Sequence, residues 1–136
     1  MFCKRLIFLV YFLVSSALLL AQKEANKWYF GEFGNINFNG NIITSTNVCG
    51  ISTIEGCSSL CDSNGDLLLY TDGRYVLNKN SLIMPNGDSL QGSYTTTQSA
   101  LIVPDPGDSL KYYVFAAGPQ AGVYSFAPYA GITYSI

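Results

Sequence analysis

The fold is decided by the stretch CSSLCDSNGDLLLYTDG, residues 57–73. It opens on the apolar run Cys57–Cys61, crosses the turn-forming residues 62–66, and continues as Leu67–Thr71 before a second turn at Asp72-Gly73. Asn-Gly and Asp-Gly between short apolar runs are strong hairpin signals. The stretch therefore predicts an antiparallel hairpin of strands Cys57–Cys61 and Leu67–Thr71.

The same alternation of apolar runs and turns extends in both directions. Trp28–Phe30 ends at Gly31, and Ile36–Phe38 meets Asn39-Gly40 before returning as Ile42–Thr44. Further strand candidates follow: Tyr75–Leu77, Ser99–Val103, Lys111–Ala116, Gly122–Phe126 and Ile132–Ile136. No stretch after residue 21 keeps helical periodicity over three turns, which parallel crossovers would need. We therefore expect an all-β protein of antiparallel hairpins.

A weak repeat is visible at an offset of 43 residues. The matched positions are Thr53 with Thr96, Glu55 with Gln98, Ser59-Leu60 with Ile102-Val103, Asp62 with Asp105, and Leu69-Tyr70 with Tyr112-Tyr113. Repeats of this length are typical of four-stranded β-propeller blades, and propellers close with about four to eight of them. Residues 22–136 would supply about two to three blades, and Ile136 falls within an apolar strand. We therefore expect an incomplete β-propeller and a fragment of a longer protein.

Residues 1–21 have the three parts of a signal peptide. Lys4 and Arg5 precede the apolar run Leu6–Leu20, and Ala21 offers a small residue for cleavage before Gln22. A membrane anchor is the alternative, but the run spans only about 22 Å as a helix, less than a hydrocarbon core of about 30 Å. We expect export through the inner membrane, with residues 22–136 secreted or on the outer cell surface.

The composition excludes several function classes. The chain has no His, which removes His-based triads and His-ligated metal sites. Residues 22–136 carry five scattered cations and nine acids, a net charge of −4, so we expect no nucleic-acid partner. Neither GxGxxG nor GxxxxGK[ST] occurs, so the known phosphate-cradling motifs are absent.

Three cysteines follow the leader, Cys49, Cys57 and Cys61. In a regular strand the Cα atoms of Cys57 and Cys61 would lie about 13 Å apart, too far for a disulfide. Cys49 could pair with Cys57 or with Cys61, or all three could be buried free thiols. Three thiols without a His do not complete a zinc site.

The carboxylates allow three interpretations. Asp62, Asn64 and Asp66 place oxygen ligands at alternate positions, which suggests calcium, although Leu67 and Gly73 stand where an EF-hand needs Gly and Glu. A catalytic acid pair among Glu55, Asp62, Asp66 and Asp72 is the second interpretation. The third is that the Asp side chains stabilise turns, as Asp commonly does beside Gly. We assign no catalytic residue and no cofactor other than calcium.

Trp28, Tyr29 and Glu55 are the candidate ligand-binding residues. The two aromatic rings could stack on a sugar or belong to the core. Glu55, like its repeat mate Gln98, could cap a neighbouring backbone or line a central channel.

Several segments in order resemble the N-terminal region of large bacterial surface proteins that end in a gliding-motility-associated C-terminal domain, the sorting signal of type-nine secretion. The segments are Lys23–Gly31, Thr53–Cys57, Asp62–Gly73, Asn78–Asn80 with Met84–Gly87, and Thr97–Pro104. The resemblance implies the opening blades of a WD-repeat-like or quinoprotein-like propeller, with the other blades as partners. It supplies no catalytic residue, and Cys49 and Cys61 depart from the pattern.

These observations predict a non-catalytic interaction or scaffold segment with a surface glycan or a protein as partner. The alternatives are part of an extracellular carbohydrate-active enzyme and a carbohydrate-binding adhesin.

Overall fold

The computed structural model describes residues 23–119 and 131–136, so the predicted signal peptide and the strand candidate Gly122–Phe126 lie outside the described residues. The described residues form nine strands and no helix. The strands are β1 (Lys27–Phe30), β2 (Gly34–Asn39), β3 (Ile42–Thr46), β4 (Ser58–Cys61), β5 (Leu67–Thr71), β6 (Val76–Asn78), β7 (Ala100–Asp105), β8 (Asp108–Ala117) and β9 (Ile132–Ser135).

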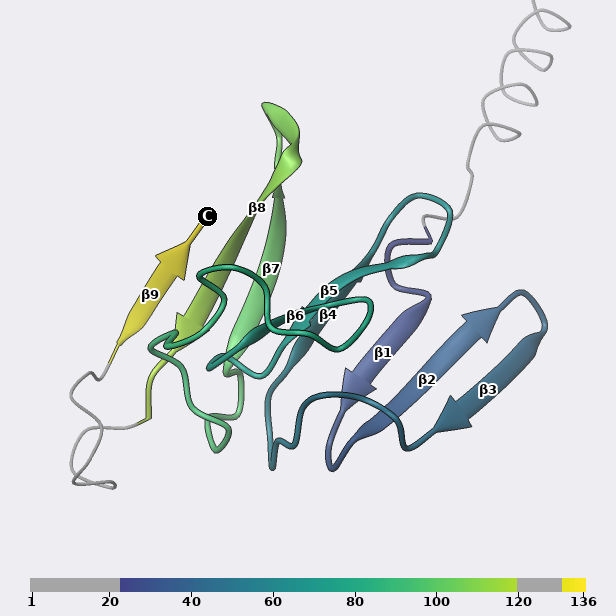
Figure 1. Ribbon diagram of the computed structural model, residues 1–136, viewed down its shortest axis with the longest axis horizontal. Helices are drawn as coiled ribbons and strands as arrows, with labels where there is room; N and C mark the ends of the chain where they lie inside the picture. The colour runs from purple at the N-terminus through teal and green to yellow at the C-terminus, as the bar shows by residue number, and fades with distance from the viewer. Residues whose placement is uncertain (1–22, 120–130) are drawn as a thin grey trace, which may run out of the picture.

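The strands form three antiparallel sheets in chain order, β1-β2-β3, β4-β5-β6 and β7-β8-β9. The first strand of the middle sheet, β4, contacts the first strands of both neighbours, β1 and β7 (Figure 1). The all-β antiparallel prediction is confirmed. The described sheets have three strands each, and they do not close on one another, so a closed propeller and four-stranded blades are not seen in these residues.

Side-chain hydrogen bonds and glycine turns fix the predicted hairpins. Asp62 Oδ1 accepts the backbone amides of Asn64 and Asp66, both at 2.9 Å, and so holds the turn between β4 and β5. In the first sheet Asn39 pairs with Ile42, so the two-residue turn is 40–41, one residue later than the Asn39-Gly40 signal suggested. Gly40 has a φ of +58°, which suits the first position of a type II′ turn.

Two hydrophobic clusters join the three sheets into layers. Ile51, Cys61, Leu67, Tyr70 and Leu77 form the first cluster, with Tyr29 of β1 packed against it. Leu69, Val76, Ile102 and Val114 form the second, between the middle and third sheets. A bulge opposite Leu60 and Cys61 breaks the alternation of β5, so that Leu67 enters the first cluster with Tyr70 while Leu69 enters the second. The middle sheet is therefore covered on both faces.

The sequence repeat does not keep one offset through the hairpins. If Ser59 is matched with Ile102, 43 residues on, their strand partners are Tyr70 and Val114, which are 44 residues apart. Tyr113 thus lies one position from the site equivalent to Tyr70. Since neighbouring residues of a strand point to opposite faces, Tyr70 is buried while Tyr113 faces outward.

We predict that Tyr70 is the most sensitive core position in this fold. Its ring is fully buried, stacks on Tyr29 at 4.4 Å, and its hydroxyl accepts the Gly50 amide at 2.8 Å. Tyr70→Ala should lower the free energy of unfolding by about 3–5 kcal/mol, and Tyr70→Phe by about 1 kcal/mol. Urea unfolding measures both. The control Tyr75→Phe, at an exposed ring, should stay within about 0.5 kcal/mol; an equal loss in Tyr70→Phe and the control would contradict the prediction.

Candidate interaction surface

The outer face of the first sheet is apolar and exposed. Strand register places Trp28, Phe30, Ile36, Phe38 and Ile43 on one side of this sheet, and we call them the Trp28 face. They point away from the middle sheet, because Tyr29, on the opposite side of β1, stacks on Tyr70 of β5. Trp28 is 52% exposed and meets Phe38 edge to face, with ring centroids 5.3 Å apart.

The third sheet exposes a second apolar face on the other side of the stack. It consists of Leu101, Val103, Tyr113, Phe115, Ile132 and Tyr134, and we call it the Phe115 face. Their neighbours along the strands, Ile102 and Val114, point inward to the core. The rings of Phe115 and Tyr134 lie 6.2 Å apart, so aromatic side chains form a continuous patch.

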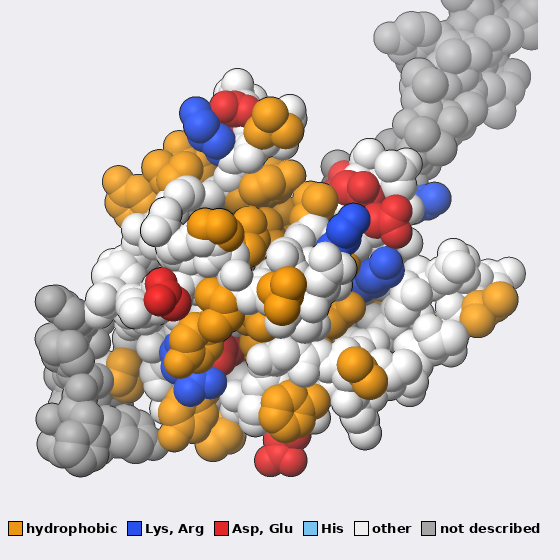
Figure 2. Space-filling view, in the orientation of Figure 1, with side chains coloured by type: hydrophobic (Ala, Val, Ile, Leu, Met, Phe, Trp, Pro, Cys, Tyr) orange, Lys and Arg blue, Asp and Glu red, His pale blue; other side chains and the backbone are white. Residues whose placement is uncertain are grey.

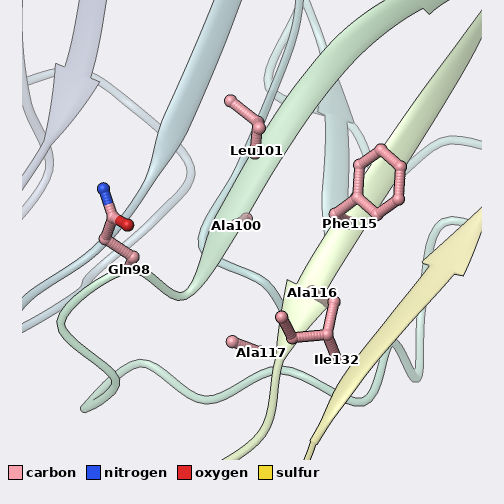
Figure 3. Close-up of a pocket in the computed structure, with 7 residues that line it drawn as sticks. All are labelled: Gln98, Ala100, Leu101, Phe115, Ala116, Ala117 and Ile132. Atoms are coloured by element: carbon pink, nitrogen blue, oxygen red, sulfur yellow. The ribbon is translucent and has the colours of Figure 1, made fainter.

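A shallow hollow of about 380 Å³ opens on the third sheet (Figure 3). Phe115, Leu101 and Ile132 stand around it, and the small side chain of Ala117, on the same side of the sheet, leaves space beside them. Ala100 and Ala116, which also line the hollow, alternate with these residues along β7 and β8. The amide of Gln98 stands at one side and supplies the one polar side chain among the lining residues. Such a hollow suits an apolar or aromatic side chain of a partner.

The residues that define the two faces are uncharged, and the nearest charge on the Phe115 face is Asp105, whose carboxylate lies at the Tyr113 hydroxyl at the hairpin end. Figure 2 shows the charged side chains in a few small groups, separated by apolar and uncharged surface. Soluble monomers rarely leave contiguous apolar patches uncovered, whereas binding surfaces commonly do. The two faces are therefore the strongest candidates for interaction sites among the described residues.

The predicted ligand residues Trp28, Tyr29 and Glu55 are not brought together. Trp28 is exposed, whereas Tyr29 points into the core, where burial and the neighbouring Tyr70 raise its pKa. Glu55 lies away from β1, and its Oε2 accepts the Thr97 hydroxyl at 2.9 Å. Of the three, only Trp28 is placed to stack on a ligand.

The sequence analysis missed an ion pair in the turn between β5 and β6. Asp72, 1% exposed, accepts both the Nε and an Nη of Arg74, at 2.9 and 2.6 Å. The guanidinium also lies over the Tyr94 ring, 4.6 Å from its centroid. Next to this pair, the Gly92 amide donates to the Gly73 carbonyl at 2.9 Å. A Cβ on Gly92 would clash with the Gly73 backbone, and one on Gly73 (φ +87°) would clash with Ser99. Arg74 is the only arginine in residues 22–136, and this was the one sequence feature that could have drawn attention to it.

The candidate calcium residues form a turn and an ion pair. Asp62 accepts hydrogen bonds from the amides of its turn. The bond from the Asp66 amide is the main reason that the pKa of the Asp62 carboxyl is lowered. Asp66 Oδ1 lies 3.4 Å from Nζ of Lys27, beside a polar hollow of about 680 Å³. Within residues 23–119 and 131–136 no three His, Cys, Asp or Glu side chains gather as a metal site would require. Calcium binding at Asp62, Asn64 and Asp66 stays a prediction.

The three cysteines are free thiols around the first cluster. Cys61 is buried in it, and Cys49 and Cys57 pack against it. Burial raises the pKa of each thiol, and the Cys49 S–H donates to the Ile51 carbonyl at 3.4 Å. The disulfide of Cys49 with Cys57 or Cys61 stays a prediction.

Comparison with known proteins identifies no relative. No family model matches the chain, no curated protein is similar to it, and no solved structure matches its fold. The resemblance to gliding-motility-associated surface proteins therefore stays a prediction. In the described part of the chain, no helix has the length and apolarity needed to cross a membrane.

The ion pairs of Asp72 and Asp66 should contribute differently to stability, because Asp72 is buried and Asp66 is exposed. Asp72→Asn should cost about 2 kcal/mol, because it leaves Arg74 without its charge partner at a buried site. Asp66→Asn should cost less than about 0.5 kcal/mol, because the Asp66 carboxylate is 77% exposed and screened by water. Chemical denaturation at pH 7 compares the two variants, and equal losses would contradict the role given to Asp72.

Asp62 should make stability depend on acid pH. Its pKa is lowered in the folded chain by the turn amides, so its contribution is full above the unfolded-state pKa of about 3.9 and is lost as pH falls through the folded value. Asp62→Asn should therefore be less stable than the parent at pH 6, and the difference should shrink below pH 4. Thermal melts from pH 2 to 7 measure it; a difference that does not change with pH would rule out the ionised carboxylate.

Proposed function

We propose that the chain is a non-catalytic interaction or scaffold segment of an exported, cell-surface-associated bacterial protein. The observation that carries the proposal is the pair of apolar faces, the Trp28 face and the Phe115 face, on opposite outer layers of the stack. A chain that presents two such faces suits packing between neighbours better than turnover of a substrate.

The packing between the three sheets suggests what would cover the two outer faces. Each pair of neighbouring sheets is joined by an apolar cluster, and the two outer faces have the same apolar and aromatic character. We propose that further sheets of the same kind, the other blades of the full-length protein, cover them. The side-by-side placement of β4 with β1 and β7 supports a propeller-like arrangement, in which first strands line the axis. Four-stranded blades and the WD-repeat-like or quinoprotein-like class belong to this proposal.

The exposed Trp28 ring favours a second candidate, a carbohydrate-binding adhesin. Indole rings stack on the apolar faces of sugars, and Trp28 with Phe38 forms an accessible aromatic pair. The carbohydrate-active enzyme gains no comparable support, since Glu55 and Asp72 are each engaged by a side chain of this chain.

One experiment tests the scaffold proposal against the adhesin. The chain is produced in its own host cell as the parent and as Trp28→Lys, Phe115→Lys and the control Ser109→Lys, which adds the same charge at an exposed hairpin residue. A scaffold uses both faces, so either face variant should shift the chain from the cell-envelope fraction to the medium. The control should behave as the parent.

The face at which a substitution reduces retention distinguishes the scaffold from the adhesin. Loss of retention in Trp28→Lys alone, together with release of the parent by soluble glycans, would indicate the adhesin. Equal retention of all four proteins would refute an interaction role for both faces. Circular dichroism of the purified variants verifies that each is folded.

A further inference from the structure

The outer edge of the first sheet has no partner among the described residues. β3 pairs with β2 on one side only, and all five of its residues are exposed. The corresponding edge of the middle sheet is covered by the chain itself. There Asn78 N donates to Leu82 O at 2.9 Å, Met84 N donates to Val76 O at 2.9 Å, and Ile83 bridges to Leu77. The edge at β6 is thus covered by residues 82–84, whereas the edge at β3 is open among the described residues.

The register identifies which backbone groups of β3 point outward. Asn39 and Ile42 close a two-residue turn, so they form a hydrogen-bonded pair, and alternation then directs the amides of Ile42, Thr44 and Thr46 to β2. In agreement, Phe38 N points the other way and donates to Asn26 O at 2.7 Å. The N–H and C=O groups of Ile43 and Ser45 therefore face outward.

β3 also lacks the features that usually protect a strand edge. Ile42–Thr46 contains no charge and no proline, and its register with β2 runs without a bulge. Lys27 is the one charged residue in the strands of this sheet, and it lies on β1, at the opposite edge. Figure 2 accordingly shows uncharged surface over β3.

We propose that this edge is a homodimer interface, in which β3 pairs antiparallel with β3 of a second copy about a two-fold axis through Thr44. In this register Ile43 faces Ser45 of the second copy on both sides of the axis, so all four outward N–H groups and all four outward C=O groups of the two strands are paired. The strand is uncharged, so nothing repels an identical strand. The strand also carries no charge that would favour pairing with a strand of different sequence.

Side-chain geometry agrees with a second copy as the occupant. Thr44 would meet Thr44 of the second copy as a close, non-hydrogen-bonded pair, in which Thr side chains are favourable neighbours. Ile43 lies on the Trp28 face, so pairing would extend that face across six strands. The proposal concerns an edge and not a face, and it therefore does not rest on the proposed function.

A charge swap at the axis tests the proposal. We expect sedimentation equilibrium of the purified chain, in reducing buffer, to show an average mass that rises from one chain toward two with concentration. Thr44→Lys and Thr44→Glu should each remain at one chain, because each places like charges opposite one another across the axis. An equimolar mixture of the two variants should regain the two-chain species, which also demonstrates that both variants fold. Ser109→Lys should behave as the parent.

Three results would overturn the proposal. The first is a parent chain that stays monomeric over the whole concentration range. The second is a dimer that persists in Thr44→Lys or that is not regained in the mixture. The third is association lost in Trp28→Lys but kept in Thr44→Lys, which would place the contact on the Trp28 face and so favour the proposed function alone.

Discussion

The structure depends on the burial of β5 on both of its faces. Tyr70 points to the first sheet and Leu69 to the third, and both are buried, so a single strand anchors both clusters. A small sheet gains stability in water when a hydrophobic face of it is covered. The first and third sheets therefore obtain stability from the middle one, and each leaves its other face uncovered.

This arrangement explains why the uncovered faces are apolar. A sheet that is stabilised by stacking on both sides has no need of a polar face, and the continuous apolar run Leu67–Leu69 of β5 has the character expected for such a strand. Trp28 with Phe38 and Phe115 with Tyr134 continue that character on the outer layers, where solvent now meets them. The outward side of these strands thus has the composition of a covered face.

Much of the fold could be predicted from residues 57–73, because turns of the Asp-x-Asn-Gly kind carry their own hydrogen bonds. Asp62 forms these bonds within its own turn, so local sequence was sufficient there. The bulge at Leu60 and Cys61 was not predictable, since it depends on which of two clusters each leucine of β5 enters. A different irregularity, between Pro104 and Asp105, sets the register of the third sheet, so Tyr113 is not equivalent to Tyr70.

The candidate site could be predicted only in part, for a related reason. Trp28 and Tyr29 are adjacent in sequence, and only the position of the middle sheet decides that one is exposed and the other buried. The Asp72–Arg74 pair is local in sequence, but its importance comes from Tyr94, which reaches the guanidinium from a distant loop. Contacts between segments far apart in the chain leave little trace in a single sequence.

The position of the cysteines has a consequence for the lifetime of the reduced protein. Disulfide exchange proceeds through the thiolate, and burial raises the pKa of all three thiols, which keeps the reactive form scarce at neutral pH. Oxidants must also reach Cys61 inside the cluster between the first two sheets. Oxidation of Cys61 would thus be gated by separation of these two sheets, and its rate would report how often they come apart.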